Sequence, residues 1–152
     1  MPKIKSHYYS EVELHYVTPP LETLKKIKTT RDIVAIIRDF YNPKKISLKE
    51  FYWGVFMTDS NHVLGICEIG VGTSNKVLTN NKELFQLALK INAVKIAIAH
   101  NHPSDGSTKA SKKDIEHAKQ VQSLAKFFDM KLTDAIIISH QGFESLIANQ
   151  LL

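Results

Sequence analysis

Two histidines, His100 and His102, stand one residue apart at the end of a short apolar run and directly before Pro103. Imidazole nitrogens are common zinc ligands, and two of them meeting about 2.0 to 2.1 Å from one ion is a normal arrangement. The carboxylate of Asp114, on the following segment, offers a third ligand. Three protein ligands with a fourth position left for water are typical of a catalytic zinc site, so this pattern predicts a metal centre.

A second interpretation of the same residues needs no metal. Surface loops carry histidines, and an H-x-H pair arises by chance about 0.3 times per chain of this composition. Ser111 and Asp114 also have the spacing of a helix N-cap and an acidic residue at the third helical position. The two interpretations are compatible, because a cap that orients the helix start also aims the carboxylate. The combination of the histidines with Pro103, Ser111 and Asp114 favours the metal site.

A water molecule activated by a metal needs a base within hydrogen-bond reach to accept its proton. Glu50 and Glu68 are the candidates, since each stands at or within an expected core strand. An acidic side chain beside a core strand is unfavourable unless it is paired, hydrogen-bonded or functional. Glu50 could equally be a solvated residue at a strand start. The pattern of residues therefore leaves the choice between Glu50 and Glu68 open.

The elements that must position these residues follow from hydrophobic periodicity and turn residues. The sequence predicts strands at 50–57, 62–72, 93–99 and 135–139, of which the first two form an antiparallel pair. Helices are predicted between Thr29 or Thr30 and Asn42, at about 82–91 after Asn80 or Asn81, and at about 112–128. Helices interleaved with hairpin and crossover strands predict an α/β fold with a mixed sheet covered by helices.

Each predicted helix has an apolar face that should meet the sheet. The residues expected on these faces are Ile33, Ile36, Ile37 and Phe40, then Leu84, Leu87 and Leu89, then Ile115, Ala118, Val121, Ala125 and Phe128. The five other histidines are expected at the surface or at strand ends: His7, His15, His62, His117 and His140.

Length and composition fit one soluble domain. The 152 residues include 43% hydrophobic and 23% charged residues, without the roughly 20 successive apolar residues of a membrane span. Residues 1–16 lack the pattern of a secretory signal, and the single cysteine, Cys67, suits a reducing compartment. We therefore expect a cytoplasmic protein, with an extended lead-in at 1–28 and one domain at 29–152.

The surface charge is moderately basic. A net charge of +5, from 20 basic and 15 acidic residues, allows weak association with nucleic acid. The lysines are spread along the chain and have no interleaved aromatic residues that could stack on bases. This distribution favours an ordinary solvated surface over a dedicated nucleic-acid patch.

Three segments resemble, in order and nearly without gaps, the RadC-like branch of the JAB/MPN (JAMM) metalloprotease-like superfamily. They are "EFYWGVFMTDSNHVLG", "GVGTSNKVLTNNKELFQLALKINAVKIAIAHNHPS" and "SKKDIEHAKQVQSLAKFFDMKLTDAIII". The resemblance covers about residues 30–147 and is most specific at 100–104. The JAMM pattern is a strand glutamate, then H-x-H-P, then S-x-x-D, and here it falls on Glu50, His100, His102, Ser111 and Asp114.

This resemblance implies a zinc ion held by His100, His102 and Asp114. It further implies that Glu50 is the general acid and base and that the Ser111 hydroxyl assists the developing oxyanion. The implied fold is a three-layer α-β-α arrangement like that of the cytidine deaminases, with the site at the edge of the sheet.

The chain departs from the family pattern at three places. The loop "PSDGSTKAS" is one residue longer than the usual RadC loop, and we expect it to bulge without displacing the helix. Asp134 precedes Ala135 where the family often has Asp-His, so we expect no catalytic role for Asp134. Full-length RadC proteins have helix-hairpin-helix motifs that depend on glycine turns, whereas the first glycine here is Gly54. We therefore expect a stand-alone protein to which the family's DNA-repair label transfers poorly.

Together these observations predict a zinc-dependent hydrolase of amide bonds that acts on a peptide or isopeptide-type substrate. The alternative is a non-catalytic binding or scaffold module of the same fold, associated with nucleic-acid processing. A deaminase acting on a nucleobase is disfavoured, because the chain lacks the H-x-E and P-C-x-x-C segments of those zinc sites.

Overall fold

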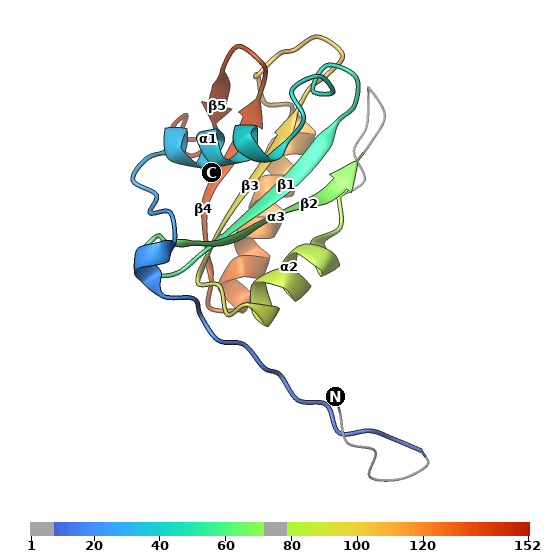
Figure 1. Cartoon of the computed structure of the whole chain (residues 1–152). Coiled ribbons are helices and arrows are strands. Elements are labelled where there is room, and N and C mark those ends of the chain that lie inside the picture. Colours follow the sequence, from blue (N-terminus) through green and yellow to red (C-terminus); the bar gives the residue numbers. More distant parts are fainter. Residues whose placement is uncertain (1–7, 72–78) are drawn as a thin grey trace.

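Runs of aromatic and β-branched residues form a five-stranded sheet in the computed structural model, which describes residues 8–71 and 79–152 (Figure 1). The strands are β1 (Phe51–Met57), β2 (Val63–Val71), β3 (Lys95–Asn101), β4 (Lys131–Ile138) and β5 (Phe143–Ser145). Their order is β2-β1-β3-β4-β5. Strand β3 pairs with β4 in parallel, and the other neighbours pair antiparallel. The predicted mixed sheet is confirmed. Residues 1–7 of the predicted lead-in and residue 72, the end of the strand predicted at 62–72, lie outside the described residues.

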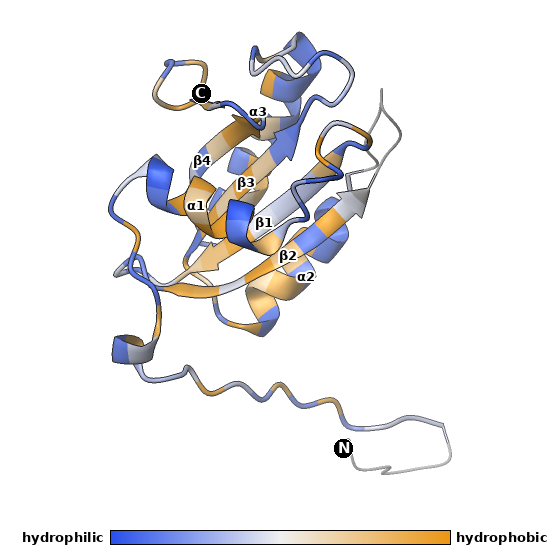
Figure 2. Ribbon diagram, turned by 45° about the horizontal axis from the view of Figure 1, so that its top comes forward, coloured by the Kyte–Doolittle hydropathy of each residue, from blue (hydrophilic) through white to orange (hydrophobic). Residues whose placement is uncertain are grey.

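Helices cover both faces of this sheet, which gives three layers. The helices are α1 (Thr30–Phe40), α2 (Asn81–Lys90) and α3 (Lys112–Phe127). Helix α1 packs through Ile33, Val34 and Ile37 on one face, whereas α2 and α3 belong to the hydrophobic cluster on the other face. Figure 2 shows that the strands beneath α1 are largely hydrophobic, as burial between two helical layers requires. The α-β-α prediction is therefore confirmed.

Polar residues at the helix starts explain where the helices begin. Thr29 is the N-cap of α1, and the Asp32 carboxylate accepts the Thr29 backbone N–H at 2.9 Å. Asn80 caps α2, because its side chain accepts the Glu83 backbone N–H at 3.0 Å. Each cap satisfies a backbone donor that has no partner within the helix.

For three residues, the prediction that the side chain faces the core is wrong. Phe40 is 48% exposed, Leu89 is 42% exposed and Phe128 is 37% exposed. Each stands in the last turn of its helix or directly after it. Phe40 and Phe128 stand where their helices end, which periodicity does not specify. Leu89 lies off the buried face of α2, which Leu84, Phe85 and Ala88 form.

The N-terminal segment joins the domain shortly before α1. Residues 8–20 extend away from the sheet and lead into a short 3-10 helix, η1 (Leu21–Thr23) (Figure 1). The Ile27 N–H then donates to the Asn61 carbonyl at 2.8 Å, and the Ile27 side chain is buried. The end of the lead-in predicted at 1–28 is thus part of the packed structure. Within the described ranges, no helix combines the length and apolar character that a membrane crossing needs.

Candidate metal centre

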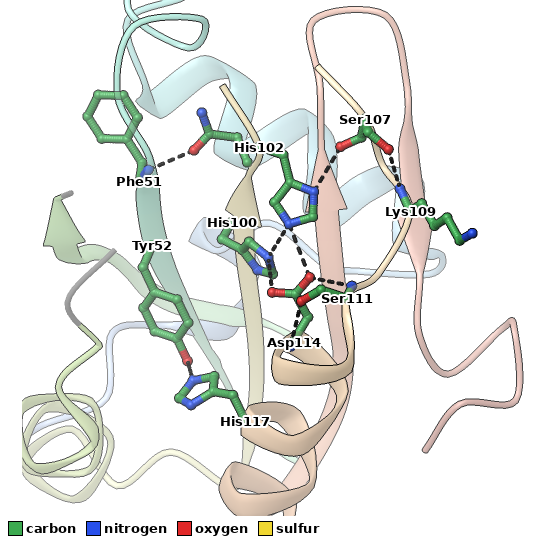
Figure 3. A network of polar contacts seen from close by, with 10 residues as sticks. Phe51, Tyr52, His100, His102, Ser107, Lys109, Ser111, Asp114 and His117 are labelled. Atoms are coloured by element: carbon green, nitrogen blue, oxygen red, sulfur yellow. Dashed lines mark hydrogen bonds and ion pairs between the residues drawn. The ribbon is translucent and has the colours of Figure 1, made fainter. Parts of the chain in front are cut away.

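The carboxyl end of β3 directs two imidazoles to one side of the sheet. Because alternate strand residues face the same side, His100 and His102 project together while Asn101 faces the opposite side. The Nε2 atoms of His100 and His102 lie 3.1 Å apart (Figure 3). The strand ends at Asn101, and Pro103 follows shortly after it.

The first turn of α3 brings a carboxylate to the same point. The Ser111 hydroxyl accepts the Asp114 N–H at 3.1 Å, and the Asp114 carboxylate accepts the Ser111 N–H at 2.7 Å. This reciprocal capping box fixes the start of the helix. Asp114 Oδ1 then lies 3.0 Å from His100 Nε2, and Oδ2 lies 3.1 Å from His102 Nε2. The same carboxylate therefore caps the helix and contacts both imidazoles.

The chemistry and spacing of these donors fit a zinc ion. Tetrahedral ligands about 2.0 to 2.1 Å from one ion lie about 3.3 Å from each other. The two imidazole Nε2 atoms lie 3.1 Å apart, and each lies 3.0 to 3.1 Å from a different oxygen of the Asp114 carboxylate, which is close to that spacing. Their side chains are 14 to 19% exposed, so the cluster is largely withdrawn from water yet still reachable. Two imidazoles and one carboxylate form a common catalytic donor set.

Hydrogen bonding in the cluster shifts two pKa values in opposite directions. Burial alone would raise the pKa of Asp114, but hydrogen bonds from His100, His102 and the Ser111 amide hold it well below its usual range. The hydrogen bond to Asp114 raises the pKa of His102, against the opposing effect of burial. Without a metal, the cluster therefore favours an ionised carboxylate beside a protonated imidazole.

The long loop after β3 supports the His102 ring from its other side. The Gly106 N–H donates to the His102 carbonyl at 2.9 Å, and Gly106 has a φ of 65°, a left-handed conformation that favours glycine. His102 Nδ1 lies 3.1 Å from the Ser107 carbonyl. A proton held on Nδ1 by this carbonyl leaves Nε2 as the metal-binding nitrogen. The Gly106–His102 hydrogen bond closes the loop, and Asp114 still contacts both histidines.

Glu50 lies on the same side of the sheet as the two histidines. Strand β1 pairs with β3 in a register that sets Tyr52 opposite His100. Glu50, two residues before Tyr52, therefore shares that face. Ligand atoms of Glu50, His100 and His102 all lie within 4.8 Å of one another. Glu50 is only 9% exposed, and burial raises its pKa although both histidines oppose the shift.

Glu68 occupies a different environment. It lies on β2, where it is exposed and pairs with Trp53 in the ladder. The structure thus brings Glu50, and not Glu68, to the imidazoles.

A pocket of about 810 Å³ opens in front of this cluster. The five residues of the JAMM pattern all contribute to its lining: Glu50, His100, His102, Ser111 and Asp114. Tyr52, Thr79, Lys109, Lys113 and His117 are among the residues that complete the walls. The candidate centre therefore has room for part of a substrate.

His117 was expected at the surface, but it lines this pocket and is half-buried. Its Nε2 lies 3.0 Å from the Tyr52 hydroxyl, and the two rings meet edge to face with centroids 5.4 Å apart. Burial lowers the pKa of His117, and the charge of His100 lowers it further. Its position three residues after Asp114 was the available signal, because such residues share one helix face.

Asp134 has a structural environment outside this pocket. It is 4% exposed and accepts hydrogen bonds from the Thr30 hydroxyl at 2.7 Å, the Ser145 hydroxyl at 2.7 Å and the Ala135 N–H at 2.8 Å. These bonds join α1, β4 and β5.

Comparisons with known proteins identify the family that the sequence matches. The family model described as "RadC-like JAB domain" matches residues 27–151. A UPF0758 protein of Desulforudis audaxviator is 33% identical over 98 residues, which cover 64% of this chain and 42% of the relative. A UPF0758 protein of Clostridium tetani is 33% identical over 106 residues, 69% of this chain and 46% of the relative. One from Clostridium novyi is 28% identical over 127 residues, 83% of this chain and 54% of the relative. The chain thus spans about half the length of these curated relatives.

Proposed function

This chain belongs to the RadC-like JAB domain family, and on that premise we propose that it is a zinc-dependent hydrolase of amide bonds in a peptide or isopeptide-type substrate. One observation carries the proposal. The Nε2 atoms of His100 and His102 lie 3.1 Å apart, and each is 3.0 to 3.1 Å from one oxygen of the Asp114 carboxylate, at the wall of a pocket that Glu50 also lines.

His100, His102 and Asp114 would hold the ion. When bound, zinc supplies a Lewis acid that acidifies a water molecule and polarises the carbonyl group of the substrate. Glu50 would accept a proton from an attacking water molecule as its oxygen bonds to the carbonyl carbon, and would then deliver that proton to the nitrogen of the leaving amine as the C–N bond breaks. The raised pKa of Glu50 suits this exchange, since burial brings it closer to neutral pH.

Ser111 is positioned to assist at the carbonyl oxygen. Its hydroxyl oxygen accepts the Asp114 N–H, which leaves its own proton available for donation into the pocket. A donor aimed at the developing negative charge stabilises the transition state more than the ground state.

Zinc content and hydrolysis test this proposal in two steps. Elemental analysis of the purified chain should find about one zinc ion per molecule, and Asp114→Ala should remove it. His140→Ala, at an exposed histidine, is the matched control and should keep the metal. Equal and negligible zinc in all three proteins would contradict the metal centre. With peptide and isopeptide libraries as substrates, Glu50→Gln should retain zinc and lose about 100 to 10,000-fold in rate.

A second candidate is a non-catalytic binding module that serves nucleic-acid processing, and the net charge of +5 allows the weak association that this role needs. Contacts between lysines and phosphates weaken steeply with salt. Retention on DNA at low salt, released as the salt concentration rises, would support this role. Absence of retention at low salt would remove it.

A further inference from the structure

Asn101, between the two histidines, makes three buried hydrogen bonds on the opposite face of β3. Its side chain is 1% exposed. Asn101 Oδ1 accepts the Phe51 N–H at 2.7 Å, a bond drawn from Phe51 in Figure 3. Asn101 Nδ2 donates to the Ile46 carbonyl at 2.6 Å and to the Lys49 carbonyl at 2.8 Å. The acceptor and both donor protons of the amide are therefore used.

Two of these bonds hold the peptide groups on either side of Glu50. The Lys49 carbonyl belongs to the peptide group before the Glu50 Cα atom, and the Phe51 N–H belongs to the one after it. Peptide groups are planar, so the backbone at Glu50 has only the two rotations φ and ψ. A side chain that binds both groups restricts both rotations. The direction in which the Glu50 side chain leaves the backbone is thereby fixed.

The ladder between β1 and β3 does not supply this restraint. The β1–β3 ladder pairs as far as Tyr52 with His100, and Glu50 precedes the first residue of β1. Asn101 continues the pairing with its side chain where the backbone ladder stops. Asparagine suits this task, because its amide offers one acceptor and two donor protons. Leucine has a similar size but no polar atoms. Aspartate would set an acceptor against the carbonyls of Ile46 and Lys49.

We propose that Asn101 is a positioning residue that fixes the backbone of Glu50 and so keeps the Glu50 carboxylate beside His100 and His102. Residues 100–102 then position both the imidazoles and the Glu50 carboxylate. His100 and His102 project from one face of β3, and Asn101 restrains Glu50 from the other face. The contribution of Asn101 to catalysis rests on the proposed function. The restraint itself exists without a metal.

Amide hydrogen exchange of the full chain, measured without zinc, tests the restraint directly. Asn101→Leu should accelerate exchange of the Phe51 amide at least about tenfold more than exchange of the Val55 amide in the middle of β1. Leu132→Ala is the matched control, because Leu132 is also buried but pairs with Ile96 at the far end of β3. That control should change the two amides by similar factors. Equal acceleration of both amides in Asn101→Leu would overturn the proposal; if that variant does not fold, Asn101→Ser is judged by the same criterion.

A crystal structure of Asn101→Leu and its zinc affinity complete the test. The Glu50 carboxylate should no longer lie within 4.8 Å of the ligand nitrogens of His100 and His102. The contacts of Asp114 with the two histidines should persist. Zinc affinity, measured by competition with a chromophoric chelator, should change by less than about tenfold. An unmoved Glu50, or loss of zinc from this variant alone, would overturn the assignment to Glu50. If the unmodified chain binds no zinc, the proposed function fails, whereas the exchange data still decide the role of Asn101.

Discussion

His117 Nε2 lies 3.0 Å from the Tyr52 hydroxyl and joins α3 to β1 at the wall of the pocket. Burial raises the pKa of Tyr52 and lowers that of His117, so both groups are neutral at physiological pH. The contact is therefore a hydrogen bond between neutral groups, close to the candidate metal ligands but separate from them.

Tyr52→Phe should lower the free energy of unfolding by about 0.5 to 1.5 kcal/mol, the usual contribution of such a hydrogen bond. Urea denaturation of Tyr52→Phe, His117→Leu and the double variant measures the coupling between the two side chains. We expect the double variant to lose less stability than the sum of the single losses, because the shared bond is removed only once. Strict additivity would show that the contact contributes nothing.

Ser111→Ala should both destabilise the protein and weaken zinc binding. Loss of an N-cap lowers stability by about 1 kcal/mol, and here the same cap orients the Asp114 carboxylate. Thermal denaturation and chelator competition measure the two effects. Ser111→Thr retains a hydroxyl and should restore most of both. A threonine variant as defective as the alanine variant would contradict the capping role.

The stability of the metal-free protein should depend on pH through His102 and Asp114. The folded-state pKa of His102 is raised above 6.5, so its contribution is complete below that pH and is lost as the pH rises through the raised value. The pKa of Asp114 is lowered below 3.8, so its contribution is complete above that pH and is lost under more acidic conditions. Glu50 acts in the same direction as His102, because its raised pKa makes the charged form unfavourable in the folded state. His117 opposes these two groups, because its lowered pKa favours the folded state as the pH rises through 6.5. Scanning calorimetry of the metal-free His117→Leu variant, which lacks this opposing group, should therefore give a higher Tm at about pH 6 than at about pH 8.

His102→Gln should reduce this difference in Tm between the two pH values. Saturating zinc should reverse it, because zinc binds deprotonated imidazoles and stabilises the folded state more as protons leave. A Tm of the metal-free His117→Leu variant that rises from pH 6 to pH 8 would contradict the assigned protonation states of His102 and Glu50.

Asp134→Ala should destabilise the fold without affecting the metal centre. The substitution leaves the Thr30 and Ser145 hydroxyls and the Ala135 N–H without their shared acceptor. We expect a loss of at least about 3 kcal/mol in the free energy of unfolding, measured with urea. Zinc content should stay unchanged. Loss of zinc from a folded Asp134→Ala protein would show that Asp134 acts on the centre.

Local patterns in the sequence determined much of the architecture. Alternation along 93–102 placed His100 and His102 on one side of a strand, because strand side chains alternate between faces whatever the strand pairs with. The spacing from Ser111 to Asp114 likewise predicted a capped helix start. The order of strand and helix patterns predicted the α/β class with a mixed sheet. All of these depend on residues near one another in the chain.

Tertiary structure decided the rest. Residue patterns left Glu50 and Glu68 open and the family resemblance favoured Glu50, but only the β1–β3 register sets Glu50 beside the imidazoles. The pocket position of His117 and the contacts of Asn101 with residues 46–51 likewise depend on which elements become neighbours. Periodicity specifies the face that a residue occupies on its own element. Which other element meets that face, and at which residue, follows from the packing of the three layers as a whole.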